Sequence, residues 1–290
     1  MSAADPKENG KLYVVATPIG NLEDITYRAI RILREVDLIA CEDTRQTRKL
    51  LEHYGIEKPT TSYHDYNEQE RAPELVAKLQ QGLSIAQVSD AGMPGISDPG
   101  YRVVKLAIEQ GISVVPIPGA SALVSSLAAS GLPTDAFEFR GFLPAKSGQR
   151  RTALETLRDA QQTVIFYEAP HRISETLREI VEILGSQRQV VIARELTKIH
   201  EEFIRGTAAE VLKSLNSREL RGEITLLIGK AESAGHATQK KDLAMRLQEI
   251  METQRLDEKA ALKLLAKEQG LSKSELYREL QRFRTKKSRP

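Results

Sequence analysis

Short apolar runs rich in β-branched residues alternate along the chain with stretches whose apolar residues recur at helical spacing. The runs predict strands, and the stretches between them predict amphipathic helices. Strands are expected at residues 12–17, 37–41, 84–88 and 112–117, and helices at residues 29–36, 47–54, 75–81 and 103–109. Gly55, Gly82 and Gly111 follow three of these helices, where glycine readily ends a helix. The alternation predicts an α/β domain, residues 1–117, built on a parallel sheet.

A second α/β domain is expected from residue 118 to residue 232. A helix-like run ends at Ser130, Gly131 and Pro133 form a turn, and a new series of strands and helices begins near Phe137. Strands are expected at residues 163–167, 190–193 and 223–228, separated by helices at residues 174–184 and 208–215. The predicted fold class is therefore α/β, with two domains that face one another and a small all-α tail behind them.

The tail, residues 233–290, differs from the rest of the chain in charge. Residues 1–235 hold 28 basic and 32 acidic residues, a net charge of −4, whereas residues 236–290 hold 14 and 8, a net charge of +6. A small polar linker, residues 231–238, leads to a helix at residues 258–269. Gly270 and a capping box from Ser272 to Glu275 then open a helix that carries Lys273 and Arg278. This pattern resembles a helix-turn-helix and predicts contact with RNA; a solvated tail or an ordinary helical bundle is the alternative.

The single cysteine, the spacing of the histidines and the length of the apolar runs exclude several classes of protein. Cys41 is the single cysteine, which excludes an internal disulfide, and it is expected to be a buried strand residue rather than a nucleophile. The five histidines lack the spacing of metal ligands. The apolar runs are shorter than the ~20 residues that span a bilayer. We therefore expect a soluble cytoplasmic protein without a membrane segment or a metal.

Three unusual loops follow predicted strands. They are TPIGNL at residues 17–22, SDAGMPGISDPG at residues 89–100 and PGASA at residues 118–122. In open α/β sheets ligands bind beside the carboxyl ends of the strands, so the three loops together predict a ligand site. For any one of them an ordinary turn is the alternative. None contains the dinucleotide-binding G-x-G-x-x-G or the P-loop pattern, which disfavours both of those site classes.

A series of longer segments carries a resemblance to a known family. In chain order they are VATPIGNLEDIT (15–26), LIACEDTRQT (38–47), VSDAGMPGISDPG (88–100), IPGASAL (117–123), SGLPTDAF (130–137), GFLPAKSG (141–148), FYEAPHR (166–172) and ARELTK (193–198). From about residue 12 to residue 229 the chain resembles the small-subunit ribosomal RNA methyltransferases of the tetrapyrrole methylase superfamily. The resemblance implies S-adenosylmethionine held between two α/β domains, a homodimer, and 2′-O-methylation of a cytidine in the decoding centre of 16S rRNA.

The resemblance also implies cofactor contacts from the three loops and, largely through the backbone, from two positions of the second domain. Met93 and Ala120 depart from the family pattern, which usually has threonine and proline there, so a side-chain contact from position 93 is not carried over. Asp90, at the end of a strand, is a candidate hydrogen-bond acceptor for the cofactor, with an Asx-turn as the alternative. The expected cofactor-binding residues are Pro18, Gly20, Asp90, Ala91, Gly92, Met93, Ile96, Ser121, Ala122, Glu168 and Leu196.

Methyl transfer to a ribose hydroxyl needs an aligned oxygen and a group that takes its proton. Lys198 and Glu195 are the candidate catalytic residues, with Glu168 as a third possible base, because all follow predicted strands of the second domain. A lysine acts as a base only when burial or neighbouring cations lower its pKa. An ordinary surface lysine is therefore the alternative for Lys198.

Other charged residues are candidate RNA contacts. Glu42, Asp43 and Arg45 follow the second predicted strand, where Arg45 is expected to grip a phosphate; helix capping by the acids is the alternative. Lys146 and Arg150, with Arg151 beside them, form a basic segment that contacts RNA or simply starts a helix. His64 and Asp65 are expected to form a turn, with a substrate contact as the alternative.

Two other functions remain open at this stage. A methylase of a small tetrapyrrole would use the same cofactor, but it has no evident need for a basic tail, and the first loop lacks the glycine-rich pattern of those enzymes. A ligand-sensing DNA-binding regulator would bind duplex DNA tightly through the tail and transfer no methyl group.

Overall fold

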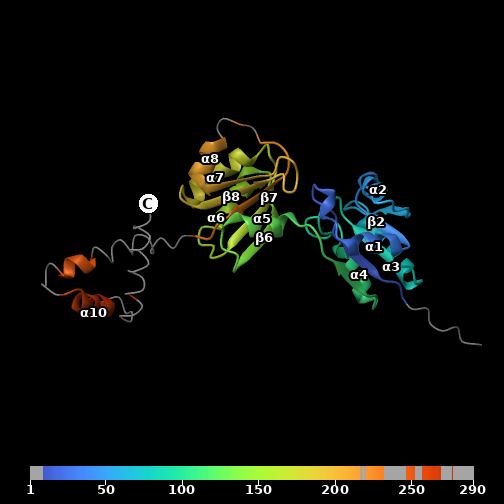
Figure 1. The fold of residues 1–290 in the computed structure, drawn as a ribbon, viewed down its shortest axis with the longest axis horizontal. Helices are drawn as coiled ribbons and strands as arrows, with labels where there is room; N and C mark the ends of the chain where they lie inside the picture. Colours follow the sequence, from blue (N-terminus) through green and yellow to red (C-terminus); the bar gives the residue numbers. More distant parts are fainter. Residues whose placement is uncertain are drawn as a thin grey trace, which may run out of the picture. The chain divides into compact units, whose positions relative to one another are not determined.

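The computed structural model describes residues 9–215, 218, 220–231, 246–251, 257–268 and 276. The chain divides into two compact units, Met1–Lys230 and Ala231–Pro290. Within the first unit two five-stranded sheets follow one another along the chain, each covered by its own helices (Figure 1).

The first sheet is entirely parallel, as predicted. Its strands run in the order β3-β2-β4-β1-β5. Four of them lie within the predicted ranges, whereas β3 was not predicted: it is three residues long, half-buried and made of hydroxyl residues at the sheet edge, so it lacks an apolar run. The strands are β1 (Leu12–Val15), β2 (Leu38–Cys41), β3 (Thr60–Ser62), β4 (Ile85–Val88) and β5 (Val114–Ile117).

Four α-helices cover this sheet on both faces. Leu38 and Ala40 of β2 pack with α3 and α4, while Ile39 and Cys41 pack with α1 and α2, because successive strand residues point to opposite faces. Both predictions about Cys41 and the glycine caps are confirmed: Cys41 is buried, and Gly55, Gly82 and Gly111 have positive φ. The helices are α1 (Tyr27–Glu35), α2 (Thr44–His53), α3 (Glu68–Gln80) and α4 (Tyr101–Glu109), and a 3-10 turn, η1 (Leu22–Asp24), precedes α1.

The second sheet is mixed, which differs from a simple continuation of the parallel pattern. Its order is β6-β7-β10-β8-β9; β6 is parallel to β7, β10 is antiparallel to β7 and β8, and β9 is antiparallel to β8. The edge strand β9 was not predicted, because its residues EFIRGT are only partly buried and show no continuous apolar run. The strands are β6 (Phe137–Phe142), β7 (Thr163–Glu168), β8 (Gln189–Arg194), β9 (Glu202–Thr207) and β10 (Ile224–Ile228).

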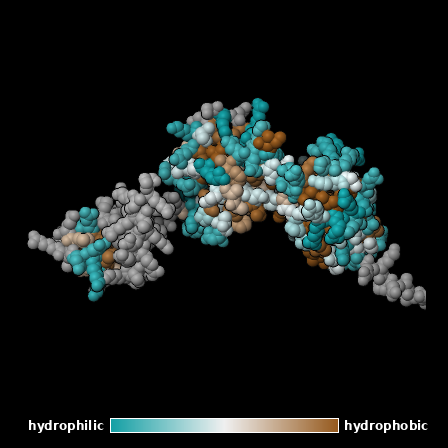
Figure 2. Space-filling model, in the orientation of Figure 1, coloured by the Kyte–Doolittle hydropathy of each residue, from teal (hydrophilic) through white to brown (hydrophobic). Residues whose placement is uncertain are grey.

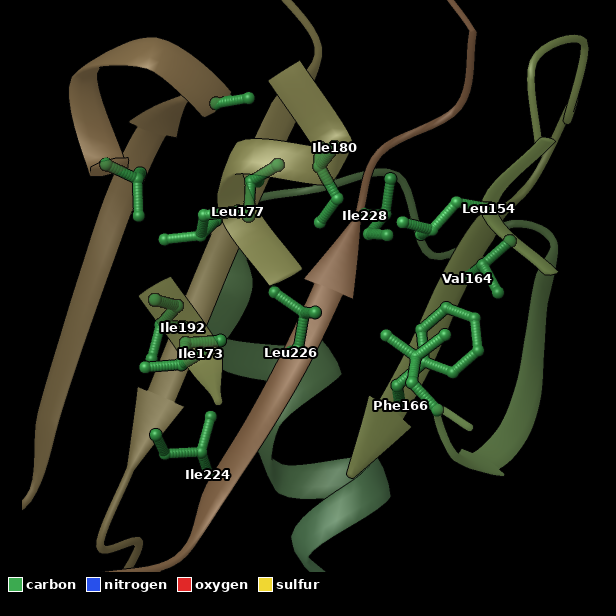
Figure 3. Close-up of a cluster of buried hydrophobic side chains, with 14 of the residues drawn as sticks. Leu154, Val164, Phe166, Ile173, Leu177, Ile180, Ile192, Ile224, Leu226 and Ile228 are labelled. Atoms are coloured by element: carbon green, nitrogen blue, oxygen red, sulfur yellow. The ribbon is translucent and has the colours of Figure 1, made fainter. Parts of the chain in front are cut away.

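One face of the second sheet carries the larger core. Figure 3 shows Leu177 and Ile180 of α7 (Ile173–Leu184) lying against side chains of β7, β8 and β10. Helices α6 (Ser147–Glu155) and α8 (Ala208–Leu215) complete this face. On the other face α5 (Ala122–Ser130) packs through Leu127, in a cluster that also contains Ile19 from the first half of the unit. The two halves of the unit therefore share a packed boundary.

In the second unit, α10 (Glu258–Glu268) confirms the helix predicted at residues 258–269. Leu262 and Leu265 of α10 pack with Leu247, Ile250 and Leu276 in a separate small core. The predicted turn at Gly270 and the basic residues Lys273 and Arg278 lie outside the described residues.

The surface in view in Figure 2 is mostly hydrophilic, with hydrophobic patches between the polar side chains. Among the helices that the structure describes, none combines the length and the apolar character that crossing a membrane requires.

Candidate active site

A cavity of about 620 Å³ lies where loops of the first sheet meet strand ends of the second. Its volume falls within the range of small-molecule sites. From the first half it is lined by Ile19, Ala91, Gly92, Met93, Ile96, Ser97, Asp98 and residues 118–124; from the second half by Phe142, Tyr167, Glu168, Ala169, Pro170, Ala193, Leu196, Gly222, Glu223, Ile224 and Thr225.

Backbone hydrogen bonds fasten the first two predicted loops to each other. The Thr17 N–H donates to the Gly92 carbonyl at 2.9 Å, and the Gly92 N–H donates to the Thr17 carbonyl at 3.1 Å. The Thr17 hydroxyl also donates to the Ser89 carbonyl at 3.1 Å. Gly92 has a φ of +80°, a conformation that favours glycine. The short bridge holds both loops at the cavity wall.

The side chain of Gln87 supports the second loop through a hydrogen bond. This buried side chain donates from Nε2 to the Pro99 carbonyl at 3.0 Å. Gly100 adopts a φ of +155°, and a Cβ there would lie 2.4 Å from Gln87 Nε2. Ser97, with a φ of +62°, also holds a conformation that costs a non-glycine residue energy. The segment that carries Asp98 is therefore fixed.

The third loop opens α5 and is packed against the first strand. A Cβ at Gly119 would lie 2.9 Å from Ala16 Cβ, so glycine allows the close approach. Ser121 is the N-cap of α5, and its hydroxyl accepts the Val124 N–H at 3.5 Å. The predicted residues Ser121 and Ala122 both line the cavity.

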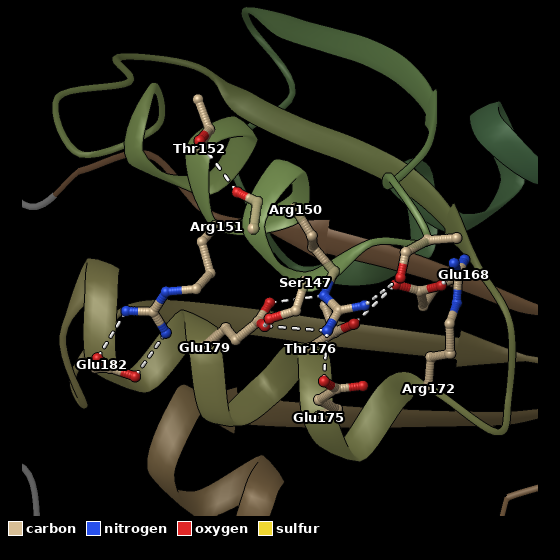
Figure 4. A network of polar contacts seen from close by, with 12 residues as sticks. Ser147, Arg150, Arg151, Thr152, Glu168, Arg172, Glu175, Thr176, Glu179 and Glu182 are labelled. Atoms are coloured by element: carbon tan, nitrogen blue, oxygen red, sulfur yellow. Dashed lines mark hydrogen bonds and ion pairs between the residues drawn. The ribbon is translucent and has the colours of Figure 1, made fainter.

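Glu168 reaches the cavity from β7, but its carboxylate is engaged inside the second half. It accepts the Ala169 N–H at 2.8 Å, Arg172 Nη2 at 2.6 Å and the Thr176 hydroxyl at 2.8 Å (Figure 4). Its side chain is buried. A role as base is therefore disfavoured, while Glu168 remains one of the residues that line the cavity.

Lys198 and Glu195, the predicted catalytic pair, do not line the cavity. Lys198 Nζ lies 2.9 Å from Glu195 Oε1 and 2.9 Å from Glu223 Oε2. Partial burial lowers the pKa of Lys198, but hydrogen bonds to the two carboxylates outweigh this and leave it raised. The Lys198 hydrogen bond lowers the pKa of Glu195. The raised pKa keeps Lys198 protonated, and the lowered pKa makes Glu195 a weak base. The structure therefore gives no support to the predicted catalytic role of the pair, which braces the loop after β8.

The second-strand residues Glu42, Asp43 and Arg45 also lie outside the cavity lining. Asp43 is the N-cap of α2 and accepts the Arg45 N–H at 2.8 Å, which is the capping role left open by the sequence. Its ion pair with Arg45, at 2.7 Å, holds the pKa of Asp43 at about 2. Asp90 accepts the Asp43 N–H at 3.1 Å, so its carboxylate supports the α2 entry. Arg45 remains exposed and available to a phosphate.

The structure contradicts the predicted contact of Arg150 with RNA. It is buried in α6 and pairs with Glu179 at 2.6 Å and Glu175 at 2.9 Å (Figure 4). A buried, paired guanidinium cannot reach a phosphate. Lys146, the exposed N-cap residue of α6, keeps its predicted place on the surface, and Arg151 pairs with Glu182.

The other expected site residues lie either on the cavity wall or beside it. Pro18, Gly20 and Asp90 lie in the predicted loops but not on the cavity wall. His64 and Asp65 form the predicted turn before α3. Of the expected cofactor-binding residues, those that line the cavity are Ala91, Gly92, Met93, Ile96, Ser121, Ala122, Glu168 and Leu196.

Several side chains of the cavity wall were not among the expected site residues, and four of them carry polar or aromatic groups that matter for the chemistry. Asp98, Phe142, Tyr167 and Glu223 all line the cavity, and Phe142 is 60% exposed. Asp98 was visible as a second aspartate in the Gly- and Pro-rich loop. Phe142 and Tyr167 pack edge to face at 5.6 Å, a pairing across strands that the sequence alone does not reveal.

Solved structures identify the fold as that of methylases built from two α/β halves. Uroporphyrin-III-C-methyltransferase from Thermus thermophilus matches 79% of this chain and 98% of its own, with 18% identity and a TM-score of 0.54. Diphthine synthase matches 76% and 90%, with 14% identity and a TM-score of 0.60. Another structure of the Thermus enzyme is complexed with S-adenosyl homocysteine.

Sequence comparison is more specific. The family model Tetrapyrrole (Corrin/Porphyrin) Methylases matches residues 11–212. Ribosomal RNA small subunit methyltransferase I of Halalkalibacterium halodurans is 46% identical over 93% of this chain and 94% of its own, and that of Mesorhizobium japonicum is 53% identical over 77% and 76%. The chain belongs to the tetrapyrrole methylases and, within them, to the family of ribosomal RNA small subunit methyltransferase I. The predicted resemblance and fold class are confirmed.

Proposed function

We propose that this chain transfers a methyl group from S-adenosylmethionine to the ribose 2′-hydroxyl of a cytidine in the decoding centre of 16S rRNA. The observation that carries the proposal is the identity of 46%, over nearly the whole chain, with a protein named Ribosomal RNA small subunit methyltransferase I. The cytidine, the ribose oxygen and the decoding centre come from the resemblance of the loop segments.

The cavity fits the proposed cofactor. Ile19, Ile96 and Leu196 offer apolar walls for its adenine ring and its methylene groups, and the Gly92 backbone allows close approach. Glu223 places carboxylate charge at the wall, which suits a positively charged cofactor. S-Adenosylmethionine, when bound, supplies an activated methyl group on a positively charged sulfur.

The role of the chain itself is to position the methyl donor and to keep water away from it. Braced loops around Gly92 and Ser121 hold the donor, so the barrier falls because the reacting groups are already oriented. The ribose hydroxyl enters from the exposed side of the cavity, where Phe142 presents an aromatic surface to the nucleotide.

RNA capture is assigned to cations outside the cavity. Arg45 and Lys146 are exposed in the first unit, and the basic tail carries Lys273 and Arg278. We further propose a tail domain from residue 233, after two α/β domains at residues 1–117 and 118–232, and a cytoplasmic homodimer, in line with the family resemblance.

The test uses labelled S-adenosylmethionine and small ribosomal subunits that lack the modification. The expected result is label in the ribose of one cytidine of the 16S rRNA, and none in subunits already modified. Label on a base would overturn the proposed reaction. Absence of S-adenosyl homocysteine binding by calorimetry would overturn the cofactor assignment.

A further inference from the structure

Three acidic residues line the cavity: Asp98, Glu168 and Glu223. They differ in what they contact. The Glu168 carboxylate already accepts hydrogen bonds from Ala169, Arg172 and Thr176. The Glu223 carboxylate forms an ion pair with Lys198, and its side chain is 73% exposed. Asp98 takes part in none of the ion pairs found in the described part of the chain. Its carboxylate is therefore the one at the wall that no cation of those pairs neutralises.

The position of Asp98 is fixed by its neighbours in the chain. Ser97 holds a φ of +62°, and the Pro99 carbonyl is anchored by Gln87. Asp98 is half-buried and lines the same cavity as Tyr167, which reaches it from β7 of the other half. Asp98 is thus a rigid, partly desolvated acidic residue on the wall of a ligand cavity, where a general base for a bound hydroxyl has to lie.

We propose that Asp98 is the catalytic base that takes the proton from the attacking ribose hydroxyl. The inference rests on the proposed function. The hydroxyl oxygen forms its bond to the methyl carbon while the carbon–sulfur bond breaks, its electron pair staying on sulfur. The proton passes from that oxygen to the Asp98 carboxylate and is afterwards released to water.

The surroundings of Asp98 suit this task. Burial raises its pKa to about 6; the charges of Glu42, Asp90 and Asp65 add to the rise, and a hydrogen bond from Ser89 opposes it. Burial also raises the pKa of Tyr167, and the charge of Asp98 raises it further, so the Tyr167 hydroxyl stays protonated and able to donate. A base with a pKa near 6 is ionised at neutral pH yet strong enough to hold the proton.

Asp98→Asn tests the assignment, because it keeps the shape and removes the base. In single-turnover methylation of unmodified small subunits, the wild-type rate is expected to rise with pH through about 6. Asp98→Asn is expected to be roughly 100-fold slower or worse and to lose that limb of the profile. Asp159→Asn, an exposed aspartate away from the cavity, is the matched control and should keep both.

Unfolding of the cofactor-free protein gives a second readout. The folded pKa of Asp98 is raised above 3.8, so its ionised form destabilises the fold above pH 6, and this cost vanishes below pH 4. Asp98→Asn should therefore raise Tm at pH 7 by roughly 2 °C or more. The difference should disappear near pH 3.5.

The outcomes separate the two proposals. If wild-type protein methylates no subunit, the proposed function fails, whatever the variant does. If wild-type protein is active and Asp98→Asn keeps its rate, the base assignment is overturned. It is also overturned if the variant only weakens S-adenosyl homocysteine binding and keeps the wild-type pH profile at saturating cofactor, since Asp98 would then bind the cofactor's positive charge.

Discussion

Arg150 and Arg151 are neighbours on α6 with opposite environments. The Arg150 side chain is 1% exposed and contacts Glu179, which is 7% exposed, whereas Arg151 and Glu182 are 36% and 65% exposed. A buried ion pair is costly to break, because removing one partner leaves an uncompensated charge. An exposed pair contributes little. The two arginines thus offer a direct measure of what burial does to the same interaction.

Arg150→Ala should lower the free energy of unfolding by about 3–5 kcal/mol, since Glu179 would stay buried without its cation. Arg151→Ala should lower it by no more than about 1 kcal/mol. Urea titration followed by circular dichroism measures both. Equal losses in the two variants would show that the buried pair has no special role in stability.

At the scale of helices and strands, the sequence predicted what has a strong apolar period. Strands β1, β2 and β4 are largely buried inside a parallel sheet, and the edge strand β5 keeps an apolar run although it is only partly buried, so all four runs are easy to find. Edge strands β3 and β9 pair on one side only and carry polar residues, which hides them. The start of α6 was predicted only as an alternative to an RNA contact, and the burial of Arg150 was missed because it depends on a partner on α7.

The candidate site, too, could be predicted only where the local sequence marks it. The three loops could be predicted because glycine, proline and the ends of apolar runs mark them locally. The Lys198 network could not, because Glu195 and Glu223 come from different loops and meet only in the fold. The expected cofactor-binding set included eight residues that line the cavity, and it gave no information on that ion pair.

The loop after α8 should be sensitive to a single methyl group. Gly222 has a φ of +87°, and a Cβ there would lie 2.2 Å from Glu195 Oε1. Gly222→Ala must therefore displace Glu195 and with it Lys198, besides straining the backbone by roughly 1–3 kcal/mol. Because Gly222 and Glu223 line the cavity, we expect weaker binding of S-adenosyl homocysteine, measured by calorimetry.

Gly131→Ala is the matched control for this change. Gly131 has a φ of +81°, and a Cβ there would meet no atom within 4 Å. It should lose a similar amount of stability and keep its affinity for S-adenosyl homocysteine. A similar loss of affinity in both variants would mean that strain, and not the Glu195 contact, governs the site.

At the scale of the whole molecule, the chain separates cofactor binding from the proposed RNA capture. The cavity lies within the first unit, and the charge of +6 lies in residues 236–290. Salt competes with cations that contact phosphates, so the slope of binding against salt concentration counts such contacts. If Lys273 and Arg278 each contact a phosphate, Lys273→Ala/Arg278→Ala should reduce that slope by about 2 for small-subunit binding. Affinity for S-adenosyl homocysteine should stay unchanged.

Lys259→Ala/Lys263→Ala removes the same charge from α10, in the same tail. If position matters, this exposed pair should change the salt slope less than the Lys273 and Arg278 pair. Equal changes would mean that only net charge attracts the subunit.

Deleting residues 236–290 tests the role of the whole tail. The first unit has its own cores, so it should still bind S-adenosyl homocysteine while losing most of its subunit affinity. Equal loss of both would make the tail a structural part of the enzyme.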